Sequence, residues 1–354
     1  MPRPTLRSVA NAAGVSTAAV SYAFNRPDRL SAQVRTQILA EARRQGYSGP
    51  DAAGRSLRTG RAGAIGVIFT VGLSYAFSDP YVLAMLGGLA EVTERTRTGL
   101  VLIPFDLGTA GLDDDARRQS LDAVHRAVID GAVADGLGDG HPAVRVLADR
   151  KIPIVQSAET TAGRCVVTDD RAAGRDIGAH LAGLGHTDVT VVVASPAEPG
   201  VPVPDVDEGT LYPYSTLRLT GIREGLGGTA RIRVVSGGRN APESGRVAAD
   251  LALAGPGRPT AIAADSDVLA SGVLDRLRAH RLRPGTDVSV TGFDDAPLAA
   301  PAGLTTVRQP MRDKGRLMGR MLLDPAYTET RVVLPTELIV RSTTGPARLP
   351  ERTS

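Results

Sequence analysis

The sequence predicts an α/β protein in which a three-helix head precedes two doubly wound α/β lobes. Three observations predict this fold. Residues 5–46 contain three short segments with helical spacing of apolar residues, each preceded by a capping residue. Residues 48–63 are dominated by Gly, Pro and Arg. From Ile65 onward, short apolar runs alternate with helical segments, which is the rhythm of parallel βα sheets.

The composition favours a globular, cytoplasmic protein. Of the 354 residues, 42% are hydrophobic, which is enough for more than one packed core. No apolar run approaches the length of a membrane span, and the opening MPRPTLRS lacks the apolar stretch of a signal peptide. The single cysteine, Cys165, excludes an internal disulfide and a cysteine-based metal cluster. Its strand-like context, RCVVTDD, favours a small buried residue over a nucleophile.

Charge is distributed unevenly along the chain. Residues 1–62 contain ten arginines, no lysine and three acidic residues, a net charge of +7, so the remaining residues carry −4 of the total of +3. A basic head on a mildly acidic body is typical of a module that binds a polyanion. A solvated basic face would have the same composition, so charge alone does not decide between the two.

The head is expected to contain a helix-turn-helix. Thr5 is placed to cap the first helix, and Gly14 to end it in a left-handed conformation. Ser16 is placed to cap the second helix, and Ser31 a third helix that runs to about residue 45. The turn between the first two helices is only about three residues long, so they must cross steeply.

A linker and two lobes are expected after the head. The linker, 48–63, contains AAGRSL, which has the length of one or two helical turns. The strands predicted beyond it are too numerous for one sheet, and facing lobes bind ligands at the carboxyl ends of their strands. The Pro-rich segment 198–214 is either a lid or a surface insertion. The predicted strands are 65–69, 99–105, 131–135, 152–157, 165–170, 188–195, 231–237, 260–265 and 287–293, and the helices between them 80–97, 112–128, 142–149, 171–184, 215–227, 242–254 and 267–280.

Motifs of catalysis and metal binding do not occur. The chain lacks a phosphate-binding loop, the HExxH helix and the GxSxG elbow, and its five histidines do not have metal-ligand spacing. Asp294 and Asp295 follow a predicted strand, where a general acid and base would lie. Without a nucleophile or metal motif beside them, hydrogen bonding to a polar ligand is the favoured interpretation. We expect neither an enzyme nor a bound cofactor or metal.

Taken in order, these motifs resemble the LacI/GalR (lactose-repressor) family of bacterial transcriptional regulators. The resemblance covers about residues 5–342 and rests on TLRSVANAAGVSTAAVS, LSAQVRTQILAEARRQGY, GRSLRTG, IGVIF, AADSDVLASGVLDRLR, DVSVTGFDDAP and LTTVRQPMRDKGRLMG. It implies a homodimeric repressor that binds palindromic operator DNA, with periplasmic-binding-protein-like lobes around a small polar effector such as a sugar. The alternatives are a two-lobe solute-binding protein or a sugar-processing enzyme without DNA binding.

The resemblance also implies domain boundaries. The head and hinge would occupy 1–62, and the core 63–342. Lobe one would comprise 63–160 and 293–324, and lobe two 161–292 and 325–342. Residues 343–354 are expected to form a flexible tail, and their lack of apolar heptads gives no support to a tetramerising coiled coil.

DNA-contacting residues follow from the same resemblance. The second helix would enter the major groove with Thr17, Ala18 and Tyr22 at the base edges. A pair of hinge leucines would part a base step in the minor groove, although packing of this leucine on the core is the alternative. Gly54 replaces the family's usual alanine there, which lowers helix stability by roughly 1 kcal/mol. The residues expected near phosphates are Ser16, Ser21, Asn25, Ser31 and Arg35, and those of the hinge are Arg55 and Leu57.

Effector-binding residues are implied in the cleft. Arg218 matches an arginine that grips ligand oxygens, and Asp294 matches an acceptor carboxylate. Asp267 either binds the effector or caps the helix that it begins. Ala158 replaces a family aspartate, which argues against an ordinary hexose-binding mode. The full set implied for the effector is Asp79, Tyr81, Arg218, Ser266, Asp267, Asp294 and Gln309.

Overall fold

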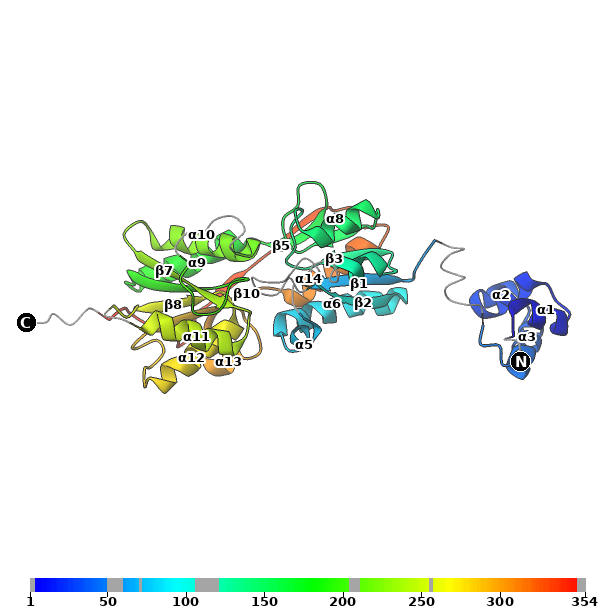
Figure 1. The fold of residues 1–354 in the computed structure, drawn as a ribbon, viewed down its shortest axis with the longest axis horizontal. Helices are drawn as coiled ribbons and strands as arrows, with labels where there is room; N and C mark the ends of the chain where they lie inside the picture. The colour runs from blue at the N-terminus through cyan, green and yellow to red at the C-terminus, as the bar shows by residue number, and fades with distance from the viewer. Residues whose placement is uncertain are drawn as a thin grey trace, which may run out of the picture. The chain divides into compact units, whose positions relative to one another are not determined.

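The computed structural model describes residues 4–49, 60–69, 72–105, 121–203, 211–254 and 257–348. The chain divides into two units, Met1–Gly63 and Ala64–Ser354. Figure 1 shows the first as a small helical head and the second as two α/β lobes. Among the described residues, no helix combines the length and apolarity that crossing a membrane requires.

The head folds as three α-helices whose boundaries its capping residues fix. The Thr5 side chain accepts a hydrogen bond from the backbone of Ser8, and Ser16 and Ser31 cap the next two helices in the same way. Gly14 adopts φ 67°, the left-handed conformation that ends the first helix. These sequence predictions are confirmed. The elements are α1 (Leu6–Ala13), α2 (Thr17–Asn25), a 3₁₀ turn (Pro27–Arg29) and α3 (Ala32–Arg44).

A compact apolar cluster holds the head together. Val9, Val20 and Ile38, one from each α-helix, are fully buried against one another. Phe24 packs edge-to-face on Tyr47 with ring centres 5.8 Å apart, which ties the end of α2 to the residues after α3. The head therefore has a core of its own.

The first lobe contains a six-stranded parallel sheet in the order β11-β5-β4-β3-β1-β2. Helix α14 contacts β3, β4 and β5, while α6 contacts α14 and β2. The strands are β1 (Ala64–Phe69), β2 (Gly99–Pro104), β3 (Gly131–Ala134), β4 (Ile154–Gln156), β5 (Arg164–Thr168) and β11 (Arg331–Leu334), and the helices α5 (Leu73–Ala76), α6 (Pro80–Thr96), α8 (Pro142–Asp149) and α14 (Met311–Leu323).

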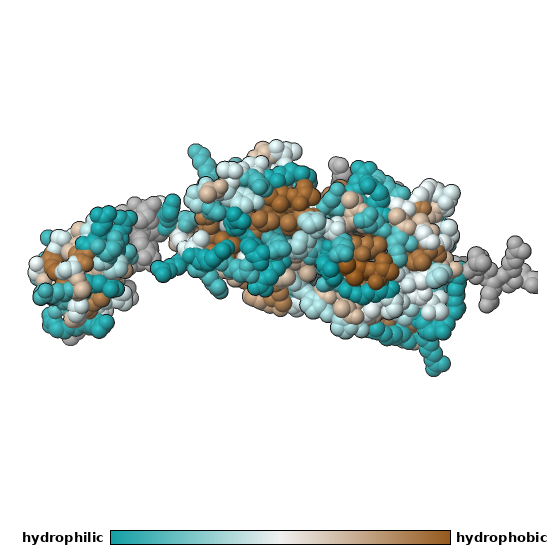
Figure 2. All heavy atoms as spheres, turned by 180° about the vertical axis from the view of Figure 1, so that it is seen from behind, coloured by the Kyte–Doolittle hydropathy of each residue, from teal (hydrophilic) through white to brown (hydrophobic). Residues whose placement is uncertain are grey.

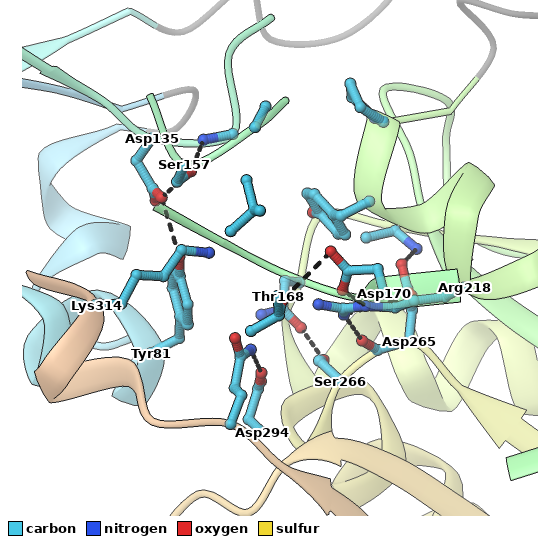
Figure 3. A pocket seen from close by; sticks show the side chains of 18 of the residues that line it. Tyr81, Asp135, Ser157, Thr168, Asp170, Arg218, Asp265, Ser266, Asp294 and Lys314 are labelled. Carbon is cyan, nitrogen blue, oxygen red and sulfur yellow. Dashed lines mark hydrogen bonds and ion pairs between the residues drawn. The ribbon is translucent and has the colours of Figure 1, made fainter. Parts of the chain in front are cut away.

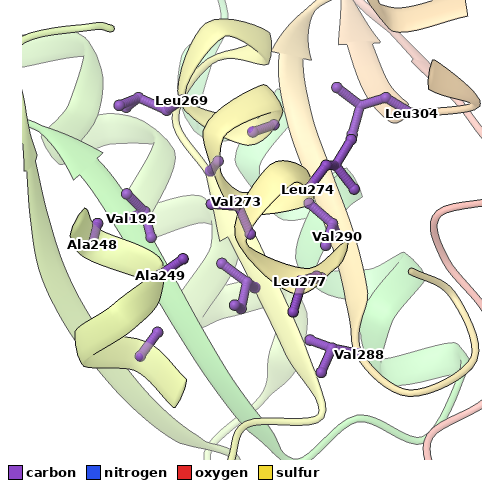
Figure 4. Packing of buried hydrophobic residues seen from close by; sticks show 14 of the residues in the cluster. Val192, Ala248, Ala249, Leu269, Val273, Leu274, Leu277, Val288, Val290 and Leu304 are labelled. Atoms are coloured by element: carbon purple, nitrogen blue, oxygen red, sulfur yellow. The ribbon is translucent and has the colours of Figure 1, made fainter. Parts of the chain in front are cut away.

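The second lobe has a matching sheet in the order β12-β10-β9-β8-β6-β7, parallel except for β12. Figure 4 shows side chains of α11 and α12 packing on those of β6 and β9, with Leu269, Val273 and Leu277 of α12 buried there. The elements are β6 (Asp188–Ala194), β7 (Arg231–Gly238), β8 (Ala261–Ala264), β9 (Ser289–Asp294), β10 (Thr305–Arg308), β12 (Glu337–Ile339), α9 (Asp170–Gly183), α10 (Pro213–Leu226), α11 (Pro242–Leu253), α12 (Asp267–Ala279) and α13 (Ala299–Ala302).

Three connections cross between the lobes, and they correct the predicted lobe boundaries. The chain passes from one lobe to the other at 168–170, 308–311 and 334–337. These positions follow from the sheets, since β5 and β11 belong to the first sheet while β9 and β10 belong to the second. The expected boundaries assign 161–168 and 325–334 to lobe two and 293–308 to lobe one, and they are wrong at these residues. Periodicity identifies a strand but carries no information about which distant strand becomes its neighbour.

The expected flexible tail is also corrected over its described part. Thr343 is 3% exposed, and its hydroxyl donates to the Val290 carbonyl at 2.8 Å. Ala347 donates its backbone N–H to the Leu184 carbonyl at 2.8 Å. Residues 343–348 are therefore packed against the second lobe, because they satisfy polar groups at its strand and helix ends. Cys165 is buried and free, as expected for a small core residue.

The surface of the core is hydrophobic in places. Figure 2 shows apolar surface gathered in patches on the core, each bordered by hydrophilic side chains.

Within the Pro-rich segment 198–214, Val203 and Leu211 are buried in the second lobe's core, and residues 204–210 lie outside the described part. The choice between a lid and a surface insertion therefore stays open.

Candidate functional site

A cavity of about 230 Å³ lies between the two lobes. Its walls come from the residues that follow the strands: Asp135 after β3, Ser157 after β4, Asp265 after β8 and Gln309 after β10. Figure 3 shows side chains converging on it from both sides. This is the position at which open parallel sheets bind ligands, because the carboxyl ends of the strands meet there.

Arg218 dominates the second-lobe wall. It lies on α10, is 8% exposed, and donates from Nε to Asp170 at 2.8 Å and from Nη1 to the Asp265 carbonyl at 2.6 Å. Its guanidinium also stacks on the Phe293 ring, 3.5 Å from the ring centre. Burial alone would lower the pKa of Arg218, but Asp170 and Asp265 outweigh burial and raise it. Arg218 is therefore a fixed positive charge, already engaged by two aspartates.

Asp265 is the carboxylate behind this arginine. Its Oδ2 accepts hydrogen bonds from the Ala194 backbone at 3.1 Å and from the Ser215 hydroxyl. Burial raises the pKa of Asp265, while Arg218 and Ser215 act in the opposite direction. The pair of carboxylates with Arg218 thus forms a rigid wall rather than a mobile surface group.

Asp294 and Gln309 form a second polar pair in the lining. Gln309 donates from Nε2 to the Asp294 carboxylate at 2.6 Å. Burial, followed by the nearby Asp267 carboxylate, raises the pKa of Asp294 well above its ordinary value. Asp294 has φ 117°, a conformation that costs a non-glycine residue on the order of 1–3 kcal/mol and that clusters at functional sites.

Asp267 does not line the cavity, contrary to the expectation. Its oxygens accept hydrogen bonds from the Thr306 hydroxyl at 2.6 Å and the Ala296 backbone at 2.7 Å, and the residue is fully buried. The alternative, that Asp267 caps α12, is also wrong, because Ser266 is the capping residue and accepts from Leu269 at 3.1 Å. Ser266 faces the cavity because the chain turns into α12 there, which directs the next side chain into the core.

The first-lobe wall is built around Asp135. The Tyr81 and Ser157 hydroxyls donate to its Oδ1 at 3.0 and 2.7 Å, and the Gly136 backbone donates to Ser157 at 2.6 Å. Burial raises the pKa of Asp135, and nearby Lys314 opposes that rise. Burial likewise raises the pKa of Tyr81, which stays a hydroxyl donor.

The two lobes meet at one rim of the cavity. Asp79 caps α6, accepting from the Tyr81 backbone at 2.8 Å. Asn240 of the second lobe donates from Nδ2 to Asp79 at 3.0 Å, and its own side-chain carbonyl accepts from Ser266. The Tyr75 hydroxyl of the first lobe lies 2.6 Å from the Asn240 backbone carbonyl. Two helix caps on opposite lobes are therefore joined through one asparagine.

The structure brings together six of the seven implied effector residues and adds others that sequence reasoning missed. Asp135 and Asp265 end the apolar runs GAVAD and TAIAAD, and both line the cavity. A carboxylate at the end of a predicted strand, the feature that indicated Asp294, could therefore have indicated them as well. Lys314 lies within the amphipathic helix α14, and nothing in its sequence context indicates a cavity residue. The missed residues are Tyr75, Asp135, Ser157, Asp170, Asn240, Asp265 and Lys314.

The implied DNA-contacting residues gather on α2 and its flanks. Thr17, Ala18 and Tyr22 are exposed on the helix, and Tyr22 keeps 40% of its surface accessible. Arg35 of α3 donates to the Ala23 carbonyl at 3.4 Å, which places its guanidinium beside α2. Ser16 is exposed and its hydroxyl caps the helix, Ser21 is half-buried, Asn25 and Ser31 are exposed, and Arg55 and Leu57 lie outside the described residues.

Metal chemistry finds no support in the described part of the chain. No group of three His, Cys, Asp or Glu side chains there has the geometry to hold a metal ion. His186, for example, bridges Thr260 and the Gly345 carbonyl at 2.9 and 3.0 Å, a structural role that joins the C-terminal segment to the second lobe.

The fold and site define a class of protein: a helix-turn-helix head joined to a two-lobe ligand-binding core. Residues 5–49 match the family described as bacterial regulatory proteins, lacI family, and residues 179–344 match a periplasmic binding protein-like domain. An HTH-type transcriptional regulator of Mycobacterium tuberculosis is 36% identical over 97% of this chain and 98% of its own length. The chain therefore belongs to the lacI family of bacterial regulatory proteins. It is a transcriptional regulator and not an enzyme.

Solved structures agree in fold. A LacI-family regulator from Corynebacterium glutamicum superposes with a TM-score of 0.71 at 28% identity, covering 98% of this chain and 100% of that one. The lac repressor dimer bound to operator and the anti-inducer ONPF gives a TM-score of 0.75 at 21% identity, over 97% and 100% of the two chains. The predicted α/β architecture of head and two lobes is thus confirmed.

Proposed function

We propose that this regulator is a cytoplasmic, homodimeric repressor whose affinity for a palindromic operator is set by a small polar effector in the interlobe cavity. The observation that carries the proposal is the cavity itself. It is lined by fixed donors and acceptors from both lobes, so a ligand there contacts two bodies at once. A ligand that prefers one lobe arrangement shifts the population towards it.

The DNA-binding part rests on the exposed face of α2. Thr17 and Ala18 offer methyl groups to thymine, and the Tyr22 hydroxyl can exchange one hydrogen bond with a base edge. Arg35 beside the helix, with Ser16 and Ser31 at helix starts, supplies phosphate contacts that set register. The head's charge of +7 adds the sequence-independent attraction on which such contacts build.

The dimer is supported by exposed apolar side chains on the first lobe. The exposed fractions of Phe77, Leu83 and Val101 are 58%, 46% and 36%. Phe77 caps the C-terminal end of α5, Leu83 lies on α6 and Val101 lies on β2. Helices α5 and α6 each contact β2. Exposed apolar side chains such as these are available for a protein–protein contact. The lac repressor is described as a dimer on its operator. We propose the same two-fold arrangement here, with each head on one half-site.

The effector is expected to carry several hydroxyl groups. Arg218, Asp294 and Gln309 present both donors and acceptors, which suits hydroxyls because each can donate and accept. The aromatic rings available in the cavity are Phe69, Tyr75, Tyr81 and Tyr214, with no tryptophan in the chain. A sugar-like molecule meets this chemistry.

The test is selection of DNA fragments by the purified full-length protein, followed by fluorescence anisotropy on a selected duplex and its scrambled version. The proposal expects at least about a thousandfold preference for the selected sequence, as specific regulators show. Equal affinity for both duplexes would refute sequence-specific regulation. Equilibrium sedimentation of the same sample should give a dimer, and a monomer that still binds the palindrome would refute the two-fold arrangement.

A further inference from the structure

Lys314 reaches into the cavity from the first lobe. It lies on α14, is 5% exposed, and its Nζ is 5.6 Å from the centre of the Tyr81 ring. The helix is held close to α6, because a Cβ on Gly315 would lie 1.9 Å from the Met85 carbonyl oxygen. Figure 3 shows the Lys314 side chain next to Tyr81 and below Asp135.

The ammonium of Lys314 has no polar partner within the ranges that the structure describes. No hydrogen bond or ion pair to a side chain or carbonyl is found for its Nζ among these residues, and the Tyr81 ring lies on one side of it. Burial lowers the pKa of Lys314, with Asp135 and Asp170 acting in the opposite direction. The ammonium of so deeply buried a lysine is costly unless an acceptor reaches it through the cavity. An acceptor atom supplied by a bound ligand would remove this cost.

Asp135 offers the complementary chemistry beside it. Its Oδ1 is occupied by the Tyr81 and Ser157 hydroxyls, while Oδ2 accepts no hydrogen bond from the described residues. Lys314 can only donate and the ionised Asp135 can only accept. Two neighbouring hydroxyl groups satisfy such a pair, one accepting from the ammonium and the other donating to the carboxylate.

The charge of the cavity selects against an acid. Arg218, the other cation, is already held by Asp170 and Asp265. A carboxylate or phosphate on the ligand would meet a lining in which acidic groups outnumber basic ones, and like charges at short range are unfavourable. The acidic residues of the lining are Asp79, Asp135, Glu159, Asp170, Asp265 and Asp294, and the basic residues are Arg218 and Lys314.

We propose that Lys314 and Asp135 form a specificity pair that binds two adjacent hydroxyl groups of a neutral polyhydroxylated ligand and discriminates against ligands with an acid group at that end. This inference rests on the proposed function, because it names the chemistry recognised by the same cavity. A lysine suits the role better than an arginine, since its compact ammonium can point all its donors at single oxygens.

The chain supplies a matched control. It contains two lysines, Lys151 and Lys314. Lys151 is exposed at the turn after α8 and does not line the cavity. Lys151→Met therefore makes the same chemical change as Lys314→Met outside the site. Asp135→Asn keeps the shape of the carboxyl group and removes its charge.

The experiment uses the full-length protein in a thermal-shift screen at neutral pH, followed by calorimetric titration. The panel consists of neutral sugars with their uronic acid and phosphate counterparts, and of cyclic polyols with their phosphate counterparts. We expect a neutral compound to bind and its acid counterparts to bind at least about tenfold more weakly. We expect Lys314→Met and Asp135→Asn each to weaken the neutral compound by about tenfold or more, while Lys151→Met matches the wild type. Unliganded melting curves check that each variant folds.

Three outcomes would overturn the inference in distinguishable ways. If an acid binds more tightly than its neutral counterpart and Lys314→Met abolishes that preference, Lys314 recognises an anion. If Lys314→Met and Asp135→Asn retain full affinity while Arg218→Ala loses it, the cavity binds the effector without this pair. If no compound that shifts operator affinity binds the cavity, the effector part of the proposed function falls as well.

Discussion

Asn240 of the second lobe donates a hydrogen bond to Asp79 of the first lobe at 3.0 Å, across the rim of the interlobe cavity. The same asparagine accepts from Ser266 through its side chain and from Tyr75 through its backbone. One residue thus links the capping residues of α6 and α12. We infer that this contact favours the arrangement of the lobes that this structure shows.

Removing the link should open the lobes. Asn240→Ala deletes the hydrogen bonds to Asp79 and Ser266, each of which contributes on the order of 1 kcal/mol. The expected result is a larger radius of gyration by solution X-ray scattering without effector. Effector affinity should fall severalfold, because closure must then be driven by the ligand. The control is Arg223→Ala, at an exposed position of α10 outside the cavity lining. Identical scattering for Asn240→Ala and wild type would contradict a closing role.

Arg218 should be required for effector binding and for stability of the second lobe. Arg218→Ala leaves Asp170 and Asp265 without their cation, and loss of one partner of a buried ion pair costs about 3–5 kcal/mol. Calorimetric titration should show no effector binding, and the unfolding midpoint should fall. Arg218→Lys keeps the charge and should recover part of the stability but not the effector affinity, since its ammonium lacks the planar fork. Full effector affinity in Arg218→Lys would remove the guanidinium from the recognition site.

Stability should depend on pH through Asp267. Burial raises the pKa of Asp267 to about 7, above the ordinary value near 4. A carboxyl group whose pKa is raised by folding binds its proton more tightly in the native state. Its contribution is therefore complete below about pH 4 and is lost as pH rises through about 7. Denaturant unfolding should show this loss between those values, and Asp267→Asn, which mimics the protonated form, should flatten it. An unchanged profile in the variant would show that other groups cause the dependence.

Arg35 should contribute one phosphate contact. In Arg35→Ala, the slope of log affinity against log salt should become shallower by about one, because one fewer counterion is released. The loss should be similar on a selected duplex and on its scrambled version, since a phosphate contact carries no sequence information. The control is Arg95→Ala, an exposed arginine on α6 of the core. An unaltered salt slope in Arg35→Ala would place this side chain away from the DNA.

Local features of the fold could be predicted from the sequence, while long-range pairing could not. Thr5, Ser16 and Ser31 act within three residues of their own position, so their capping roles follow from local order. Strand β5 instead pairs on one side with β11, a strand more than a hundred positions away along the chain. The lobe boundaries failed for this reason.

In the candidate site too, residues at strand ends could be predicted from local sequence, while residues placed by packing could not. Asp294 was predicted because it ends an apolar strand, and Asp135 and Asp265 obey the same rule. The prediction for Asp267 was wrong because neighbouring residues at a strand–helix junction point in different directions. Ser266 lines the cavity, whereas Asp267 points into the core of the second lobe. Lys314 could not be predicted, since its position depends on how closely α14 packs against α6.

In the proposed regulator, binding in the interlobe cavity and binding to the operator are energetically coupled. The direct measurement is a thermodynamic cycle: operator affinity with and without saturating effector, and effector affinity with and without saturating operator. Linkage requires both ratios to be equal, and we expect a factor between about 5 and 150. A ratio of one in both directions, with both ligands bound, would show that the effector does not control operator binding.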